Sequence, residues 1–223
     1  TQDKTAVNEL VSGSLALKLG LPTLDIVFVN LPQDIIQLSD DLRQRNIQSG
    51  LHIGFKRLPE DVLDFTYLND DMLLDKTLVN RDELYGVVNF DNWVLNTDRN
   101  NQGNNMIEFL PQNQIRYIMI DFGHCFTGNN WNQDLQNAIN RQDLMGVFDF
   151  IRRQLISINE FEKWFVTIES MNDTEIDSIV DSIPSAWNLS QNEKSILLEL
   201  IKNRKHLVRN IICNNRVTLN LDN

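Results

Sequence analysis

Cysteine and histidine are scarce in this sequence, and the few that occur form no recognisable site. Cys125 and Cys213 lie far apart and show neither metal-ligand spacing nor the dense spacing of a disulfide scaffold. We therefore expect no structural disulfide and a cytoplasmic location, since disulfides belong to oxidising compartments. The three histidines stand outside H-E-x-x-H and similar patterns, which argues against a zinc centre.

Positive charge is scarce as well. The chain has 20 lysines and arginines against 31 aspartates and glutamates, which gives a formal net charge of −11. A protein that binds nucleic acid or an anionic membrane directly needs a basic face, so we expect neither as a partner. No apolar run approaches the roughly 18 residues of a membrane-spanning helix, and no signal-peptide pattern opens the chain.

Familiar catalytic signatures are missing too. The sequence contains no G-x-x-x-x-G-K-[ST] loop and no G-x-S-x-G elbow, which excludes a P-loop nucleotide enzyme and argues against an α/β-hydrolase. His124 and Cys125 are neighbours, but adjacent residues of an extended segment point to opposite faces and would not engage each other. The 223 residues, 42% of them hydrophobic, suffice for one substantial domain or for two small lobes that share a core.

The N-terminal part of the sequence predicts a helix and two strands. Apolar residues recur at helical spacing over Thr5–Gly20, whereas Leu24–Leu31 and Gly50–Phe55 have the length and composition of strands. Between the two strands, a helix is expected over Pro32–Asn46, because proline is favoured at a helix start. Glu9 lies beside the apolar stripe of the first helix, where a solvated carboxylate is the ordinary interpretation.

Outside its centre, the rest of the chain predicts mainly helices. We expect two short helices between Pro59 and Asn80 and a longer one over Arg81–Trp93. Two S-x-x-E capping boxes, at Ser157 and Ser190, open helices in the C-terminal part, whose apolar residues form amphipathic stripes. The organisation is therefore a mixed α+β front part followed by an all-helical C-terminal part.

The most informative stretch runs from Asn89 to Phe126. A polar loop that carries Asp98 and several asparagines precedes two apolar segments, Met106–Leu110 and Ile115–Ile120, whose spacing predicts a β-hairpin. Asp121 directly follows the second strand, so the hairpin brings its carboxylate back beside the asparagines. A carboxylate and a carboxamide can hold a hard cation through oxygen, with Asp98 nearby as a separate acid or base. Phosphoryl transfer needs such a cation clamp and one carboxylate that positions a hydroxyl.

Two other interpretations apply to the polar loop. An EF-hand calcium loop starting at Asp98 fits at Asn100 and Gly103 but fails at its twelfth position, where Phe109 replaces the bidentate glutamate. The loop also leads into a strand instead of a helix. An asparagine-rich turn with a purely structural role is the second alternative, and the position of Asp121 after a strand favours a functional site over it.

A family resemblance rests on two segments of this stretch, FDNWVLNTDRNNQGNNMI and IMIDFGHCF. They resemble the catalytic and metal-binding segments of HipA-like bacterial kinases, which are distant relatives of the protein kinases and phosphoinositide kinases. The family pattern has an N-x-D-R start, an asparagine just before a strand, and an apolar strand that ends in aspartate. Asp98 and Arg99 match the start, Asn105 matches the asparagine with Asn104 as second choice, and Asp121 matches the final acid.

The resemblance implies an α+β, two-lobed protein-kinase-like fold. Residues 1–57 would form a small N-terminal lobe with the Glu9 helix, strands and a linker, and residues 58–223 a larger, mostly helical C-terminal lobe. Glu9 would be the helix glutamate that pairs with the lysine of the ATP phosphates. No Gly-rich loop and no suitable lysine precede it, because Lys4 is too close and Lys18 lies on the same helix. Since the chain opens with Thr, these elements are expected before residue 1.

The resemblance also implies a function. Asp98 would accept or orient the substrate hydroxyl, while Asn105 and Asp121 would hold Mg²⁺ at the phosphates of ATP. The expected reaction transfers the γ-phosphoryl group to a Ser/Thr hydroxyl of a protein substrate, the kinase itself included, and an antitoxin-type protein is the expected partner. Arg99 would contact a phosphate or pair with a carboxylate. The alternative is a pseudokinase-like nucleotide-binding or interaction module without catalysis, and a lipid kinase is disfavoured by the acidic charge.

Overall fold

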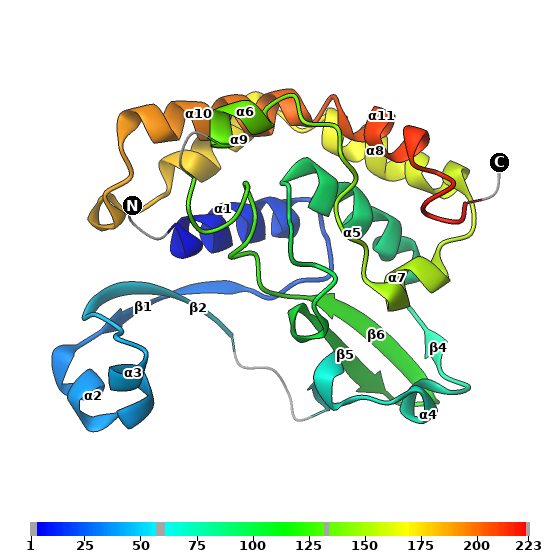
Figure 1. Cartoon of the computed structure of the whole chain (residues 1–223). Helices are drawn as coiled ribbons and strands as arrows, with labels where there is room; N and C mark the ends of the chain where they lie inside the picture. Colours follow the sequence, from blue (N-terminus) through cyan, green and yellow to red (C-terminus); the bar gives the residue numbers. More distant parts are fainter. Residues whose placement is uncertain (1–3, 57–60, 132–133, 222–223) are drawn as a thin grey trace.

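The computed structural model describes residues 4–56, 61–131 and 134–221 and shows a mixed α+β fold (Figure 1). In these residues the strands form a two-stranded sheet and a four-stranded sheet, and helices make up the C-terminal part. The predicted α+β class and the helical C-terminal part are therefore confirmed.

The front of the chain consists of helix α1 (Thr5–Lys18) and an antiparallel pair of strands, β1 (Ile26–Leu31) and β2 (Gly50–Phe55). These three elements confirm the predicted helix and strands. The helix expected between the strands is instead two short ones, α2 (Gln33–Leu38) and α3 (Asp40–Gln44). The break falls at Ser39, whose hydroxyl accepts a hydrogen bond from the backbone N–H of Leu42 and so caps α3.

The chain between residues 61 and 80 differs most from its prediction. It forms β3 (Val62–Asp64), the 3₁₀ turn η1 (Phe65–Tyr67), the short helix α4 (Asp70–Leu73) and β4 (Thr77–Leu78). The prediction of two helices was thus wrong for one of them, because pairing with distant strands makes β3 and β4 extended. Residues 57–60, where the predicted helices begin, lie outside the described part of the chain.

The predicted hairpin is confirmed as β5 (Asn105–Leu110) and β6 (Gln114–Met119), which follow the 3₁₀ turn η2 (Gln102–Asn104). They form the centre of a sheet with the strand order β3-β5-β6-β4. Asn105 pairs with Met119 at the base of the hairpin. This register places the residues just before β5 beside those just after β6, which include Asp121.

A predicted helix, α5 (Arg81–Trp93), is confirmed residue for residue and leads into the polar loop. Behind it follow short helices and turns: α6 (Asp134–Ala138), α7 (Asp149–Gln154), η3 (Ile158–Phe161), α8 (Glu162–Glu169), α9 (Asp173–Asp181), η4 (Ser185–Trp187), α10 (Gln191–Arg204) and α11 (Val208–Asn214). The predicted capping box at Ser190 is present at the start of α10. None of the helices in the described ranges combines the length and apolar character that a bilayer span requires.

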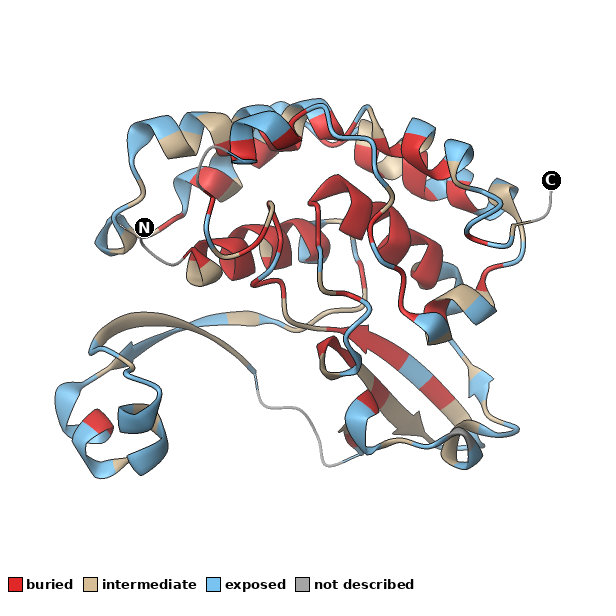
Figure 2. Cartoon of the chain, in the orientation of Figure 1, coloured by how far each residue is buried: buried red, intermediate tan, exposed pale blue. Residues whose placement is uncertain are grey.

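One continuous hydrophobic core joins α1, α5, the hairpin and the C-terminal helices. Figure 2 shows the buried residues concentrated along α1, α5 and β6, whereas α2, α3 and the middle of β1 are mostly exposed and β2 is intermediate. The predicted division at residues 57 and 58 falls in the segment outside the described residues, so that boundary stays a prediction. The core has one consequence for function: α1, which carries Glu9, is packed directly against the segment that carries Asp121.

Candidate active site

The polar loop after α5 is shaped by a buried carboxylate. Asp91, in the last turn of α5, accepts hydrogen bonds from the Asn96 amide at 2.9 Å and from Nε of Arg99 at 3.0 Å. Burial raises the pKa of the Asp91 carboxyl, while Arg99 and Asn96 lower it. The Arg99 guanidinium lies 3.0 Å from the carboxylate and offsets part of the cost of burying it. Asp98 lies between Asn96 and Arg99 in the sequence. By binding both of them, Asp91 fixes the chain before and after Asp98.

Arg99 ties this loop to the base of the hairpin. Its side chain is only 1% exposed, and its Nη1 donates to the carbonyl of Asn104 at 2.5 Å and to that of Ile120 at 2.7 Å. Burial disfavours the guanidinium charge, but the nearby Asp91 outweighs that effect and raises the pKa of Arg99 above its usual value. Of the two roles expected for Arg99, the structure gives it a carboxylate partner, Asp91.

The amide of Asn105 is used entirely within the protein. The side chain is completely buried, and its Nδ2 donates to the carbonyls of Arg99 at 3.0 Å and Asn101 at 2.6 Å. Its Oδ1 accepts a hydrogen bond from the Tyr117 hydroxyl at 2.5 Å. Tyr117 thus holds this oxygen inside the fold, away from the surface of the loop. The metal role expected for Asn105 stays a prediction, and the second choice, Asn104, has a different environment.

Asn104 has the geometry that Asn105 lacks. Its Nδ2 donates to both the backbone oxygen and the carboxylate Oδ2 of Asp98, each at 2.9 Å. Because both partners are acceptors, the amide nitrogen must face Asp98, which turns Oδ1 the other way. Among the described residues none donates a hydrogen bond to this oxygen. Asn104 thus fixes the Asp98 carboxylate on one side and offers an oxygen ligand on the other.

Asp121 completes the group from the other strand. The backbone N–H of Ile120 donates to the carbonyl of Asn104 at 3.2 Å, so Asp121 follows directly after the contact between the two hairpin ends. Its backbone has φ 58°, a left-handed conformation that aspartate tolerates better than most residues. The Asp121 Oδ1 accepts a hydrogen bond from the N–H of Gly123 at 3.1 Å. The carboxylate is half-buried and lies beside the side chain of Glu9.

Glu9 of α1 reaches this site from the opposite side. Its Oε1 accepts a hydrogen bond from the N–H of Phe122 at 2.9 Å, and the residue is only 7% exposed. A Cβ on Gly123 would lie 3.3 Å from Oδ1 of Asp121 and 3.4 Å from Oε1 of Glu9, so both carboxylates flank this glycine. Burial, followed by the Asp121 charge, raises the pKa of Glu9 to about 8 despite the Phe122 hydrogen bond. The solvated carboxylate expected as the ordinary interpretation is not what the structure shows.

The comparisons with known proteins identify a family and a fold. The model of the HipA-like kinase family matches residues 1–214. The chain belongs to the HipA-like kinase family. A crystal structure of the Helicobacter pylori proinflammatory kinase CtkA superimposes with a TM-score of 0.62 at 15% identity, covering 98% of this chain and 89% of that one, which shows a shared fold. A search of curated proteins finds no match. Family membership makes the protein a kinase, and such kinases use ATP and a divalent metal ion.

In this HipA-like kinase, α1 is held on the Asp121 segment by a residue that the sequence did not point out. Asn8 is completely buried, and its Nδ2 donates to the carbonyls of Gly123 at 2.7 Å and Cys125 at 3.0 Å. Its Oδ1 accepts from the Trp131 indole at 2.9 Å. The signal available in the sequence was an asparagine next to the apolar stripe of a helix. Asn8 and Glu9 together set the position of α1 relative to the site.

The two lysines of α1 and its N-terminal flank are engaged elsewhere. Lys4 pairs with Glu193 at 2.7 Å, and Lys18 pairs with Glu175 at 2.7 Å. Oε2 of Glu9 is buried and has no hydrogen-bond partner among the described residues. With its pKa raised to about 8, the Glu9 carboxyl holds a proton at neutral pH, and a cation placed at this oxygen would favour the ionised form.

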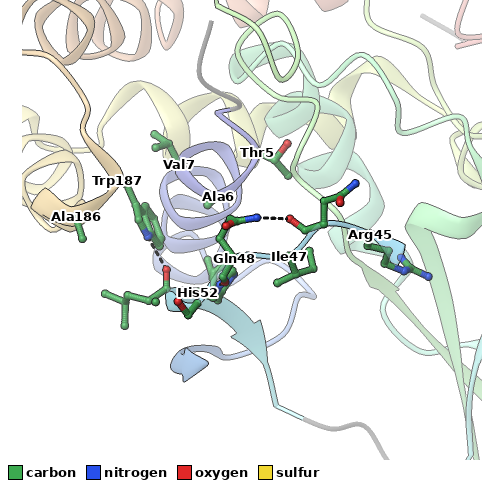
Figure 3. A pocket seen from close by; sticks show the side chains of 14 residues that line it. Thr5, Ala6, Val7, Arg45, Ile47, Gln48, His52, Ala186 and Trp187 are labelled. Carbon is green, nitrogen blue, oxygen red and sulfur yellow. Dashed lines mark hydrogen bonds between the residues drawn. The ribbon is translucent and has the colours of Figure 1, made fainter. Parts of the chain in front are cut away.

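A cavity of about 730 Å³ lies at the N-terminal end of α1 (Figure 3). It is lined by the first residues of α1, by residues 45–53 and by Trp187, whose indole donates to the carbonyl of Leu51 at 2.8 Å. Asp98, Asn104 and Asp121 do not line it, although Thr5 reaches Gly123. No group of three or more His, Cys, Asp or Glu side chains in the described part of the chain could hold a metal ion by itself. A metal at the site of this kinase would therefore need amide, phosphate or water oxygens as well.

Proposed function

We propose that this HipA-like kinase transfers the γ-phosphoryl group of ATP to a Ser/Thr hydroxyl of a protein, its own hydroxyls included, with Mg²⁺ as the divalent ion. The observation that carries the proposal is the side chain of Asn104. Its nitrogen holds the Asp98 carboxylate and leaves Oδ1 for a ligand, while the backbone carbonyl of Asn104 accepts a hydrogen bond from Ile120, the residue before Asp121. Asn104 thereby links the Asp98 carboxylate, which would orient the hydroxyl, to the two side chains that would bind a cation, Asn104 itself and Asp121.

The donor set fits Mg²⁺. Oδ1 of Asn104 and the Asp121 carboxylate are hard oxygen ligands, and Mg²⁺ keeps several waters and takes few protein oxygens. When bound, Mg²⁺ would supply positive charge that neutralises the charge developing on the phosphates during transfer. The metal role expected for Asn105 passes to Asn104 in this proposal, because the oxygen of Asn105 is occupied by Tyr117.

Asp98 is proposed to orient the substrate hydroxyl and to receive its proton. As the bond from the hydroxyl oxygen to the γ-phosphorus forms, the bond from that phosphorus to the bridging oxygen breaks, and ADP leaves with the electron pair. Asn104 would keep the carboxylate aligned throughout, since it contacts both the backbone and the side chain of Asp98. Arg99 and Asp91 would hold the loop rigid beneath it.

Glu9 is proposed to pair with a lysine that contacts the ATP phosphates. Its support is the buried Oε2 atom, which lacks a donor among the described residues. An ammonium group there would also lower the raised pKa of Glu9 and let the carboxylate ionise at neutral pH. Neither Lys4 nor Lys18 is available for this pairing.

The remaining expectations also stay proposals. We place residues 1–57 in a small N-terminal lobe and residues 58–223 in a larger C-terminal lobe, which is supported by the separate two-stranded β1–β2 sheet in front of the helical part. A protein substrate, an antitoxin-type partner and a cytoplasmic location are proposed from the family resemblance and the acidic composition.

A pseudokinase-like module is the second candidate, and one observation favours it. Both lysines near Glu9 are paired with other glutamates. Neither of them is therefore available to contact the phosphates of ATP, as the lysine of an active kinase would. This candidate binds nucleotide or a partner protein but transfers no phosphate. Calorimetric titration with Mg²⁺ and ATP, combined with the transfer assay below, separates the two.

The test uses the full chain, γ-labelled ATP and Mg²⁺, with phosphorylated residues located by mass spectrometry. We expect label on serine or threonine for the wild type and for Asp71→Ala, an exposed matched control. For Asp98→Ala we expect a loss of roughly 100-fold or more, which is the usual contribution of a catalytic base. Equal label on wild type and Asp98→Ala refutes the proposal, whereas ATP binding without label in any variant supports the pseudokinase.

A further inference from the structure

We infer that a small cavity beside the catalytic loop binds one aromatic or large aliphatic side chain of the protein substrate, next to the residue that is phosphorylated. The inference rests on the proposed function and adds a substrate class to it. The cavity has a volume of about 150 Å³ and lies between η1, α4, the loop at Gln102 and the start of α7. It is separate from Asp98, Asn104 and Asp121, none of which lines it.

The floor of this cavity is aromatic. The ring of Phe65 contacts Phe148 edge-on with centroids 4.8 Å apart, and it contacts Phe150 with centroids 5.0 Å apart. Leu68 and Leu73, both partly buried, supply aliphatic wall. A benzene ring fits an enclosed apolar cavity of roughly this volume, which sets the size of side chain that this partly open cavity can take. Its chemistry and size therefore fit a single ring or a leucine-sized side chain.

The rim of the cavity is polar. Arg153 and Asp149 form an ion pair at 2.5 Å in which both side chains are more than half exposed, at 67% and 58%. Such an exposed pair contributes little to stability, so its charged groups are free to contact a ligand. Gln102 and Asn69 add exposed amide groups. An apolar floor under a polar rim suits a peptide whose backbone crosses the rim while one side chain inserts.

The cavity adjoins the loop that carries Asp98. The backbone N–H of Asn101 donates to the carbonyl of Asp98 at 3.1 Å, which folds Gln102 back toward it. On the other side, the segment before α7 packs on the same loop, because a Cβ on Gly146 would lie 3.3 Å from the Asn100 side chain. The Cα atoms of residues 98 and 102 are at most about 15 Å apart along the chain. An extended substrate covers that span in about four residues.

These observations determine the occupant. A hydroxyl placed at Asp98 belongs to a chain that must continue along the surface of the loop, and the cavity lies within four residues of that point. The inserted side chain is therefore at one fixed position within four residues of the phosphorylated serine or threonine. Side chains too small to fill the cavity gain no burial and bind less well.

The experiment measures phosphorylation of a peptide library by the full-length protein. Each peptide has a central serine or threonine, and each other position in turn carries one fixed amino acid. For the wild type we expect kcat/KM to be about tenfold or more higher with Phe, Tyr, Leu or Met than with Ala at a single position. If the wild type phosphorylates peptides without such a preference, the cavity proposal is overturned and the kinase function stands. If it phosphorylates no peptide and no protein, both fail.

Two tryptophan variants locate the preference. Leu73→Trp fills the cavity, and Leu74→Trp is its matched control, because Leu74 is the next residue and is 66% exposed. We expect Leu73→Trp to lose the preference for large apolar side chains, and Leu74→Trp to keep the wild-type preference. Leu68→Trp serves as a second filling variant if thermal unfolding shows Leu73→Trp to be misfolded. The proposal is overturned if a folded Leu73→Trp or Leu68→Trp variant keeps the preference for large apolar side chains. It is also overturned if these variants raise the KM for ATP equally with all peptides, since that result would assign the cavity to the nucleotide.

Discussion

Replacing Glu9 by glutamine should remove a pH dependence from the stability of the protein. Glu9 is buried beside Asp121, and burial, followed by that neighbouring charge, raises its pKa from 4.5 to about 8. In the unfolded chain the carboxyl has its ordinary pKa. Between these two pH values the folded state therefore holds a proton that the unfolded state releases. The protonated Glu9 carboxyl therefore stabilises the fold fully at a pH below its pKa in the unfolded chain. This stabilisation is lost as the pH rises through its pKa in the folded protein.

The size of the effect follows from the gap between the two pKa values. Each unit of gap corresponds to about 1.4 kcal/mol, so this single group should lower the unfolding free energy by about 1.4 kcal/mol per pH unit between about pH 5 and 8. Over the whole window the loss approaches roughly 4 kcal/mol, which is a large fraction of the stability of a typical domain. Glutamine keeps the shape and one acceptor oxygen for the Phe122 N–H, but it does not titrate.

Urea unfolding from pH 5 to 8.5, in the presence of EDTA and without nucleotide, measures this effect. The difference between wild type and Glu9→Gln cancels the groups that titrate in both proteins. We expect that difference to change steadily with pH, with the wild type losing stability relative to the variant as the pH rises. Glu160→Gln, at an exposed position, is the matched control and should run parallel to the wild type. Parallel curves for wild type and Glu9→Gln would refute the buried placement of Glu9 beside Asp121.

Two further predictions concern the packing around the site. Tyr117→Phe removes the hydroxyl that donates to Oδ1 of Asn105. Because that buried oxygen is left unpaired, the free energy of unfolding measured in urea should fall by about 1–3 kcal/mol. An unchanged midpoint would show that the hydrogen bond is not formed. Gly123→Ala places a Cβ 2.9 Å from the methyl group of Thr5 and should destabilise the protein by about 1–3 kcal/mol. Thr5→Ser removes that methyl group, so the double variant should recover part of the loss in thermal unfolding, and strictly additive effects would argue against the contact.

The sequence predicted the elements whose patterns are long and regular. α1 and α5 have apolar residues at helical spacing over several turns, and β5 and β6 are apolar segments joined by a short turn. Local pattern was sufficient there because each element buries one continuous face. β3 and β4, with three and two residues, are too short to show any period, and only their pairing with β5 and β6 makes them strands.

The site shows a different limit. The order of Asp98, an asparagine and Asp121 was visible in the sequence, but the choice between Asn104 and Asn105 was not. These neighbours differ in which way the chain turns as it enters β5, and that direction is set by Tyr117 and Arg99 from elsewhere in the fold. The burial of Glu9 was equally invisible, because a single helix does not show which segment will cover it.

The most direct test of the account compares the Mg²⁺ dependence of phosphoryl transfer in two variants. Asn104→Ala removes the oxygen proposed as a metal ligand and the contact with Asp98, whereas Asn105→Ser changes a buried amide that faces only protein atoms. We predict that Asn104→Ala raises the Mg²⁺ concentration for half-maximal rate by about tenfold or more, the scale reported for changes around metal sites. Asn105→Ser should lose stability but keep the wild-type Mg²⁺ dependence. The reverse pattern, a shifted Mg²⁺ dependence for Asn105→Ser and none for Asn104→Ala, would contradict the proposed site.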